Sequence, residues 1–266
     1  MQSAAAEKGQ VSKTAAEIYD EFFVPSLFGQ WAGPLCEAAG VEPGQAVLDV
    51  ACGTGATTRE AATRVQPGGR VTGLDCNSGM LAVASARAPD IRWVEDRAEE
   101  LPFPDESFDA VLCQFALMFF EDRARALSEM RRVLRPGGRL ALSVWDEAAN
   151  SPGYDAMIAL IETMFGKEAA DALRAPFVLG ERARLSKVLE AGGLAGAEVA
   201  TKQGTARFAS IREWVRMDVR GWTLAEFIDD DGFEALVKEA ERTLRAYEGA
   251  DGAVAFPAPA HIVTWS

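Results

Sequence analysis

Short apolar runs alternate with amphipathic stretches over the first 145 residues of the chain. The runs are rich in apolar and β-branched residues, which is typical of buried parallel strands; they lie at 46–50, 70–75, 91–94, 109–115 and 139–145. Stretches with apolar residues at helical spacing follow Thr57, Asn77 and Asp122. This alternation predicts an α/β fold around a parallel sheet.

The pattern changes after residue 145. Residues 146–178 are predicted to be helical, another helix is predicted at 179–191, and strands are predicted at 198–210 and 261–265. About fifty mostly helical residues separate these two strands, and an insertion between adjacent strands must fold outside the sheet. We therefore expect residues 146–178 and 211–256 to form a helical cap on a domain that spans 40–266.

The first 39 residues differ from the rest in their aromatic content. Helices are predicted at 14–23 and 27–39, and aromatic residues crowd them: Tyr19, Phe22, Phe23, Phe28 and Trp31. One interpretation is a pair of amphipathic helices that bury these rings on the sheet, and the other is a flap over a binding cleft. The pattern leaves both open, and we predict a helical lid over residues 1–39.

The turn after the first strand carries the clearest chemical signal. Asp49 is followed four residues later by Gly53, with Gly55 two residues beyond it, and a helix begins directly afterwards. Two glycines let the backbone turn sharply and let a ligand approach it closely. The dinucleotide fingerprint has a third glycine where this chain has Thr58, which argues against an NAD or FAD site. A glycine turn without a ligand remains the alternative at this point.

Acidic residues stand at the ends of the next two strands. Asp75 lies 22 residues beyond Gly53, close to the spacing at which a carboxylate reaches a ribose diol in a Rossmann unit. Asp96 follows the third strand, and ligands of such sheets bind outside the carboxyl ends of the strands. The alternative for Asp75 is a helix cap, although Asn77 and Ser78 also suit that position.

Composition narrows the possible partners. The formal net charge is −13 and the sequence pI is about 4.7, and no cluster of Lys and Arg suits a nucleic acid or an anionic membrane. The four cysteines are widely spaced, so neither a zinc nor an iron–sulfur site is predicted. The sequence shows no apolar leader and no membrane span, and we expect a cytoplasmic protein with free thiols.

Two further runs, at 96–109 and 131–140, identify a family. Asp96-Arg97-Ala98-Glu99-Glu100-Leu101-Pro102-Phe103-Pro104-Asp105-Glu106-Ser107-Phe108-Asp109 and Arg131-Arg132-Val133-Leu134-Arg135-Pro136-Gly137-Gly138-Arg139-Leu140 are similar to signatures of one group. Together with the glycine turn, they resemble the class I S-adenosylmethionine (SAM) methyltransferases of the ubiquinone-biosynthesis-like group (methyltransferase domain 11). The resemblance covers about residues 40–146 and favours a ligand-binding turn over an empty one.

The resemblance implies a fold and a set of cofactor contacts. The fold is a Rossmann-like, doubly wound sheet of seven strands in the order 3-2-1-4-5-7-6, with strand 7 antiparallel and a helical cap. The cofactor is SAM, the product is S-adenosylhomocysteine, and no metal is needed. The implied cofactor contacts are Asp49, Gly53, Gly55, Asp75, Met80, Asp96, Ala98 and Gln114. Asp75 would hold the ribose hydroxyls, Met80 would pack on the adenine, and Asp96 would accept from its amino group.

The acceptor is predicted from the aromatic content of the lid and the cap. We expect a small, fairly apolar molecule, because aromatic walls with few polar anchors are typical of small-molecule pockets. The candidate acceptor residues are Tyr19, Phe23, Phe28, Trp31, Phe119, Trp214, Arg216 and Trp222. Arg216 suits an acidic group on the acceptor, and a surface arginine is the alternative. We expect a monomer or a homodimer without nucleic-acid or membrane partners.

Methyl transfer from a sulfonium is an in-line displacement, so the protein must align the reacting atoms and exclude water. A base is needed only where the acceptor loses a proton. Asp146 at the end of the fifth strand is the candidate, with a helix cap or solvated acid as the alternative, and the sole histidine, His261, favours a structural role. Two other functions stay open: an NAD(P)-dependent oxidoreductase, and a SAM-binding regulator without catalysis.

Overall fold

The structure is a computed structural model, and it describes residues 13–221 and 223–266. Its main sheet has seven strands in the order β3-β2-β1-β4-β5-β9-β6. The strands are β1 (Ala46–Val50), β2 (Arg70–Asp75), β3 (Arg92–Glu95), β4 (Phe108–Gln114), β5 (Leu134–Trp145), β6 (Glu198–Lys202) and β9 (Ala260–Trp265). The first five are parallel, and β9 runs antiparallel between β5 and β6. The predicted fold class and strand order are confirmed.

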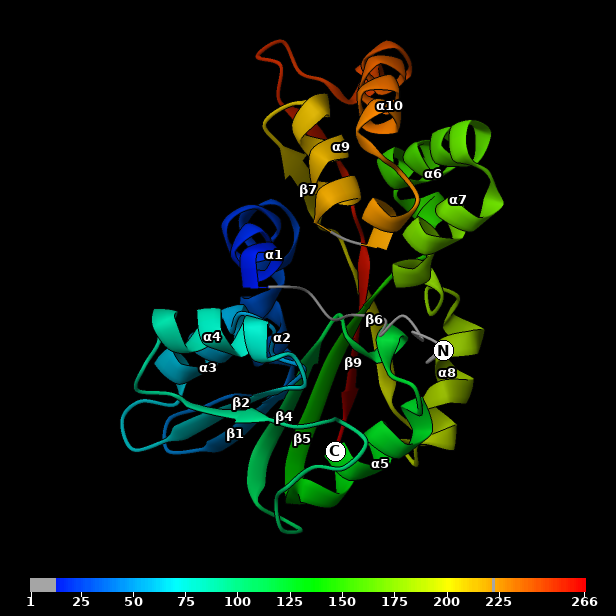
Figure 1. The fold of residues 1–266 in the computed structure, drawn as a ribbon. Coiled ribbons are helices and arrows are strands. Elements are labelled where there is room, and N and C mark those ends of the chain that lie inside the picture. The colour runs from blue at the N-terminus through cyan, green and yellow to red at the C-terminus, as the bar shows by residue number, and fades with distance from the viewer. Residues whose placement is uncertain (1–12, 222) are drawn as a thin grey trace, which may run out of the picture.

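Helices cover both faces of this sheet, as Figure 1 shows. The first face carries α2 (Ala32–Ala38), α3 (Ala56–Arg64) and α4 (Ser78–Arg87), and α1 (Lys13–Ile18) packs on α4. The second face carries α5 (Arg123–Val133) and α8 (Arg182–Ala191). Residues 96–107, between β3 and β4, contain turns and no helix. The second face is therefore covered by a loop rather than a helix beside β2 and β3.

The strands β1, β4 and β5 form the centre of the core. Every residue of β1 is buried, and so are five of the seven positions of β4, because both faces of these strands lie under helices. Asp49 is the polar exception in β1, and its Cα pairs with Gly73 on one side and Leu112 on the other. The carboxyl ends of β1, β2 and β4 consequently meet at one edge of the sheet.

A second group of elements stands beyond this carboxyl edge, at the top of Figure 1. It contains α6 (Pro152–Phe165), α7 (Lys167–Arg174), α9 (Ile211–Arg220), α10 (Asp230–Thr243) and a two-stranded sheet of β7 (Thr205–Phe208) and β8 (Val254–Pro257). We call these elements the cap. The division of the chain into lid, sheet domain and cap remains a proposal.

One predicted strand was wrong in its length. A single strand was expected over 198–210, but β6 ends at Lys202 and β7 leaves the main sheet to pair with β8. Gly204 lies at the break, where a Cβ atom would approach the Trp31 ring to 2.3 Å. Trp31 thus packs where a continuous strand would pass. The prediction also missed β8 within the insertion.

The N-terminal segment is helical from Lys13 to Ala38, but not as two regular helices. α1 passes into a π-helical stretch, η1 (Tyr19–Phe28), and a 3₁₀ turn, η2 (Gly29–Trp31), precedes α2. Pro25 lies inside η1; a proline cannot donate the usual helical hydrogen bond, which accounts for the irregular geometry. Further 3₁₀ turns are η3 (Leu117–Phe119), η4 (Ala148–Asn150), η5 (Ala175–Phe177), η6 (Thr223–Glu226) and η7 (Arg245–Tyr247).

Candidate functional site

The glycine turn joins β1 to α3 in left-handed backbone geometry. Ala51, Gly53 and Gly55 have φ values of +54°, +54° and +80°, and Gly55 is the N-cap of α3. A Cβ atom at Gly55 would lie 2.4 Å from the Trp93 ring of β3. Gly55 is therefore required twice, for its backbone angle and for the indole beside it. The sequence analysis missed Trp93, because its partner at Gly55 lies 38 residues away in the chain.

Asp75 ties the end of β2 to this turn. Its Oδ2 accepts from the Gly53 N–H at 2.8 Å, and its Oδ1 accepts from the Asn77 N–H at 2.9 Å. Burial raises the pKa of the carboxyl, and these backbone hydrogen bonds oppose the shift. Asn77, not Asp75, caps α4 by accepting from Gly79 and Met80. A carboxylate oxygen can accept more than one bond, so both oxygens keep capacity for a diol.

A small cavity of about 30 Å³ lies beside the turn, between Gly53 and the N-terminal segment. Four buried side-chain oxygens of residues that line it have no hydrogen-bond partner among the described residues; they are Asp49 Oδ1, Thr54 Oγ1, Thr57 Oγ1 and Gln114 Oε1. Buried polar atoms without partners cost free energy and are rare in folded proteins. Their concentration around one cavity indicates a place for a polar ligand.

Asp49 is the charged member of this group. Its Oδ2 accepts from the Thr58 hydroxyl at 2.6 Å, and its side chain is buried beneath the turn. Burial raises the pKa of Asp49 to about 7, although the hydrogen bond from Thr58 opposes the shift. Thr58 stands where a dinucleotide site would have glycine, and it serves here to hold the carboxyl in place.

The remaining predicted cofactor residues lie along the same edge. The Asp96 N–H donates to the Asp75 carbonyl at 3.1 Å, so the ends of β2 and β3 are adjacent. The Asp96 carboxylate accepts from the Arg97 N–H and is half-buried, and Ala98 is buried. Met80 packs against Ala16 and Tyr19 under α1. Their contacts with adenine stay predictions.

Aromatic rings connect the N-terminal segment to the ends of β4 and β5. The Phe28 ring lies 5.2 Å from Tyr19, 5.7 Å from Phe115 and 5.9 Å from Trp145, centroid to centroid. Phe115 and Trp145 stack at 3.9 Å, and Phe115 has a φ of +52°, which is rare for a bulky residue. The sequence analysis missed this pair, because adjacent strands bring it together and neither lies in a recognised motif.

The N-terminal segment lies beside the glycine turn, where Tyr19 and Val24 line the cavity. Phe23, Phe28 and Trp31 are all buried, as the alternative of packed helices predicts, and a lid over the cleft stays a prediction. Asp20 fastens the segment, because its carboxylate lies 2.7 Å from Arg87 of α4 and 3.8 Å from Arg59 of α3. Burial, with Asp75 nearby, raises the pKa of the Tyr19 hydroxyl over the cavity.

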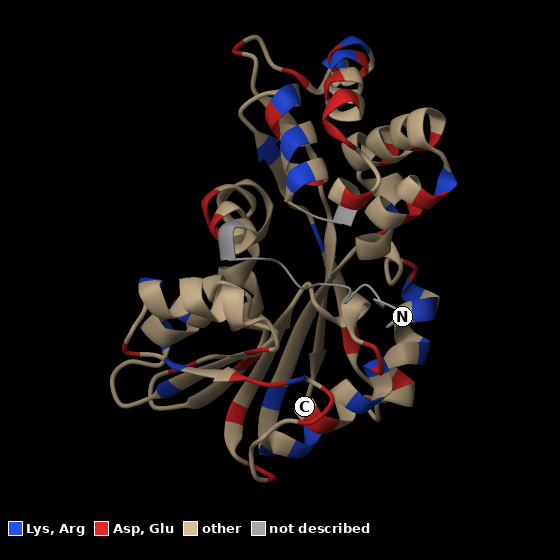
Figure 2. Cartoon of the chain, viewed as in Figure 1, with Lys and Arg blue, Asp and Glu red and all other residues tan. Residues whose placement is uncertain are grey.

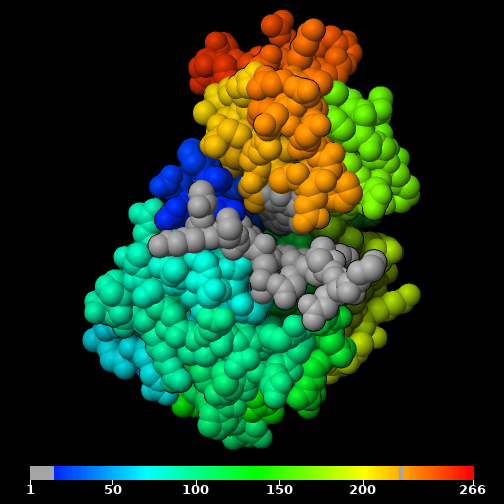
Figure 3. All heavy atoms as spheres, viewed as in Figure 1, coloured from blue at the N-terminus to red at the C-terminus, as the bar shows by residue number. Residues whose placement is uncertain are grey.

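The cap meets this segment through α9. The Arg216 guanidinium lies 4.7 Å from the centre of the Phe22 ring, and a Cβ atom at Gly221 would meet the Phe23 ring. Figure 3 shows the N-terminal segment against the yellow part of the cap on this face. Arg216 is already paired with Glu213 at 2.6 Å. Its role toward an acceptor stays a prediction.

Two further acceptor candidates lie away from the glycine turn, and one lies outside the described residues. Trp214 is fully buried within the cap, where its ring stacks on Phe208 at 5.6 Å and lies 4.7 Å from Phe256. Phe119 is half-buried on η3, beside η5. Trp222 lies outside the described residues. Contacts of all three with an acceptor stay predictions.

Asp146 directly follows β5, lies in a hydrogen-bonded network and does not line the cavity. Its Oδ1 accepts from the Glu147 N–H at 2.8 Å and lies 3.3 Å from His261 Nε2, and its Oδ2 accepts from Asn150 at 3.0 Å. His261 also contacts the Gly180 carbonyl at 2.7 Å and Thr201 Oγ1 at 2.9 Å. These contacts support the structural role of His261, and general-base action by Asp146 stays a prediction.

Charged residues of both signs are interspersed along the elements, as Figure 2 shows. Within residues 13–221 and 223–266, no group of three or more His, Cys, Asp and Glu residues is placed to hold a metal ion. The same residues include no helix that is long and apolar enough to cross a membrane.

Comparison with known proteins places the chain in a family. A methyltransferase domain model matches residues 48–142. The ubiquinone/menaquinone biosynthesis C-methyltransferase UbiE of Pseudomonas savastanoi is 36% identical over 179 residues, which are 62% of this chain and 70% of that protein. The chain belongs to the class I SAM-dependent methyltransferases, in their ubiquinone-biosynthesis-like group. The resemblance stated from the sequence is confirmed.

Other members of this group match over less of their length. The UbiE protein of Hahella chejuensis is 37% identical over 148 residues, 52% of this chain and 59% of that protein. The chain spans about three fifths of the length of the first curated relatives that it matches.

A solved structure from Anabaena variabilis, assigned as a methyltransferase of an antibiotic biosynthesis pathway, has a TM-score of 0.67 at 18% identity. It covers 89% of this chain and is itself covered to 96%. That likeness concerns the fold alone.

Proposed function

We propose that this protein transfers the methyl group of SAM to a small, fairly apolar acceptor. The observation that carries the proposal is the set of unpartnered oxygens around the cavity at the glycine turn. Asp49 and Gln114 offer acceptors for the ammonium of an amino acid. Thr54 and Thr57 offer hydroxyl donors for its carboxylate near the N-terminal end of α3, where the helix favours negative charge. The donor set therefore fits the methionine end of SAM.

The neighbouring strand ends suit the adenosine end of the same molecule. Asp75 is buried with its carboxylate fixed between Gly53 and Asn77, so it would hold a ribose diol without reorganising. Asp96 follows on the next strand and would accept from the adenine amino group. A sulfonium cation also suits a site with two carboxylates, whereas NADP would require cations at its phosphate.

The lid must open to admit SAM. A cavity of about 30 Å³ holds about one water molecule, and Tyr19 and Val24 of the N-terminal segment form part of its wall. The ion pairs from Asp20 to Arg87 and Arg59 hold the segment in place. We infer that the segment moves out to admit the cofactor and closes over it afterwards, which would exclude water.

Bound SAM supplies an activated methyl group, so the protein has mainly to position the acceptor and keep the site dry. The Phe115–Trp145 stack and Phe28 form an apolar wall at the ends of β4 and β5, next to Gln114 of the cavity. Asp146 remains the candidate base for an acceptor that loses a proton, provided that closure releases it from Asn150.

The acceptor itself is the open part of the proposal. The family model ends at residue 142, before the cap begins at α6, so the family model does not bear on the cap. Relatives are named for ubiquinone/menaquinone biosynthesis and for demethylmenaquinone methylation. Demethylmenaquinone is therefore the first acceptor to test, followed by smaller phenols and apolar amines.

The test has two arms. Calorimetry should show binding of SAM and of S-adenosylhomocysteine, and no binding of NADH. An acceptor screen with methyl-labelled SAM should show transfer that depends on the protein. Binding of NADH without SAM would overturn the proposal in favour of an oxidoreductase. Tight SAM binding without transfer to any acceptor would favour a regulator.

A further inference from the structure

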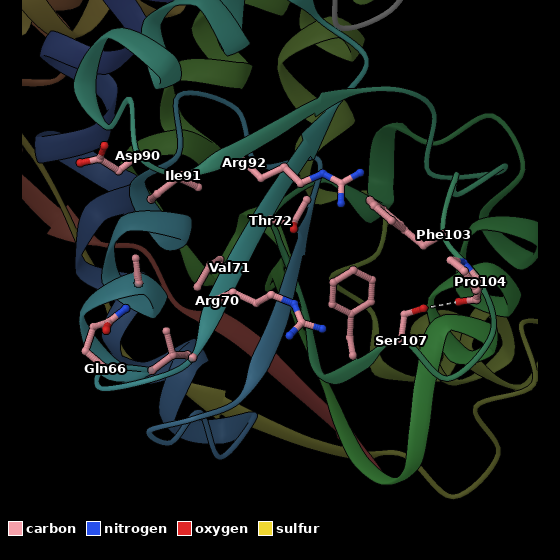
Figure 4. Close-up of a pocket in the computed structure, with 14 residues that line it drawn as sticks. Gln66, Arg70, Val71, Thr72, Asp90, Ile91, Arg92, Phe103, Pro104 and Ser107 are labelled. Carbon is pink, nitrogen blue, oxygen red and sulfur yellow. Dashed lines mark hydrogen bonds between the residues drawn. The ribbon is translucent and has the colours of Figure 1, made fainter.

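A second cavity, of about 490 Å³, lies at the opposite end of β2 from the glycine turn. It is lined by the start of β2, by residues before and at the start of β3, by the end of α3, and by the loop that replaces a helix between β3 and β4. Figure 4 shows these residues around the first residues of β2. Its size is in the range that small-molecule sites occupy.

The topology explains why the cavity is present. The pairing of β2 with β3 begins only at Thr72 and Arg92, so the outer edge of β2 at Arg70 and Val71 has no strand partner. Beside it, residues 96–107 form turns, which leave space between the sheet and Phe103. The cavity is therefore a consequence of a missing strand extension and a missing helix.

Two arginines from adjacent strands face this space. In Figure 4 the side chains of Arg70 and Arg92 extend from the strands toward the loop that carries Phe103, with Thr72 between them. The Arg92 guanidinium lies 5.7 Å from the centre of the Phe103 ring. Phe103 and Phe108 are buried and pack edge to face at 5.1 Å. Cationic groups thus stand beside an apolar, aromatic wall.

Neither arginine has an ion-pair partner within the part of the chain that the structure describes. The charge of Arg70 contributes to lowering the pKa of Asp109, but the Asp109 carboxylate is bound by Arg135 at 2.6 Å and by the Ala46 N–H at 2.7 Å. Asp105 is likewise taken by Arg132 at 2.8 Å. Among the described residues, Asp90 is the one acidic residue that lines the cavity, so the two arginines leave it with a net positive lining in a chain with a net charge of −13.

We propose that this cavity binds a small organic anion with a flat apolar body, such as an aryl carboxylate. The anionic group would pair with Arg70 and Arg92, whose planar guanidinium groups match carboxylate geometry. The ring would lie against Phe103. The site is separate from the glycine turn, and the proposal does not depend on methyl transfer.

The test uses 2-naphthoate as the probe, with calorimetry on the full chain saturated with S-adenosylhomocysteine. The wild type should bind the anion, and the double variant Arg70→Gln/Arg92→Gln should bind it about tenfold more weakly or worse, because charge-assisted bonds are lost. Arg242→Gln removes one positive charge, as each of the single variants Arg70→Gln and Arg92→Gln does, from the exposed end of α10, and it should bind as the wild type does. Arg70→Lys/Arg92→Lys is the fourth protein of the series. Naphthalene-2-methanol, the neutral analogue of the probe, should bind all four proteins weakly and with similar affinity.

The lysine variant sharpens the assignment, since it keeps the charge but loses the planar fork; its affinity should fall between those of the wild type and the glutamine variant. If the double variant fails to fold, Arg70→Gln and Arg92→Gln singly carry the test, as both side chains are exposed. Absence of 2-naphthoate binding by the wild type would overturn the proposal. So would unchanged binding by the glutamine variants, because the anion would then lie elsewhere.

Discussion

The sheet domain and the cap each contain a buried carboxyl group, and the two groups differ in their surroundings. Asp49 lies under the glycine turn and Asp218 lies in α9 of the cap; both are almost inaccessible, and burial raises the pKa of each. Asp49 borders a cavity whose other walls carry unpartnered oxygens. Asp218 lies in the packed core of the cap, where its charge raises the pKa of the Tyr154 hydroxyl, and it does not line either cavity described above.

This comparison indicates that burial of an acid is not sufficient to identify a binding site. A buried acid that faces a cavity with other unpartnered groups has a ligand to gain, whereas a buried acid in a packed core only carries a cost. We therefore propose that Asp49 belongs to the cofactor site and that Asp218 only lowers the stability of the cap. The predictions below test that difference.

The largest effect is expected at Asp75, on the ligand-binding side of the comparison. Asp75→Ala should weaken SAM binding by about 1–3 kcal/mol, because the diol contact and the support of the Gly53 N–H are lost together. Asp75→Asn should be milder. Calorimetry measures both, and Asp218→Asn, the same change in the cap, should leave SAM affinity as it is. Wild-type affinity in the alanine variant would show that the ribose lies elsewhere.

The second prediction concerns the pH dependence of ligand binding. The pKa of Asp49 is about 7 without ligand, and an ammonium group would favour the ionised form. Affinity for S-adenosylhomocysteine should therefore rise with pH up to about 7, by at most about tenfold per pH unit, and then level off. Asp49→Asn should flatten this slope, since the amide still accepts from Thr58. A slope that survives the substitution would assign it to another group.

The third prediction takes the cap side. Because burial raises the folded-state pKa of Asp218 above its unfolded value, the folded protein holds the proton more tightly. Stability should then fall as pH rises from about 4 toward the folded pKa. Asp218→Asn should remove this loss and raise the free energy of unfolding at neutral pH by about 1 kcal/mol or more. Thermal unfolding at several pH values measures it; a parallel pH profile in both proteins would contradict the assignment.

The smallest effect is expected at the lid. Asp20→Asn removes the ion pairs with Arg87 and Arg59. Because both arginines keep solvent contact, the free energy that holds the N-terminal segment in place should fall by about 1 kcal/mol or less. Hydrogen exchange over residues 13–31 should become faster in the variant and should slow when S-adenosylhomocysteine is bound. Arg242→Gln, which breaks a pair of the cap surface, is the control. Exchange rates over residues 13–31 that change neither with the ligand nor with the substitution would argue against an opening lid.

Patterns within the sequence were enough to predict the sheet, the glycine turn and the family. These features are local, since an apolar run, the Asp49-to-Gly55 spacing and the runs at 96–109 and 131–140 each lie within a few consecutive residues. The strand order followed from the family and was confirmed. The positions of Asp75 and Asp96 at the same edge could be predicted, because the carboxyl ends of parallel strands meet at one edge of a sheet.

The contacts between side chains of different elements became visible only in the folded protein. The Trp93 ring against Gly55, the Phe115–Trp145 stack and the break at Gly204 against Trp31 each join residues from different elements. Arg70 and Arg92, which have no ion-pair partner among the described residues, come together because of the strand register and because residues 96–107 form no helix. A residue pattern predicts neither feature. Propensity acts along the chain, whereas packing and charge compensation act through space, so these features appear only once the chain is folded.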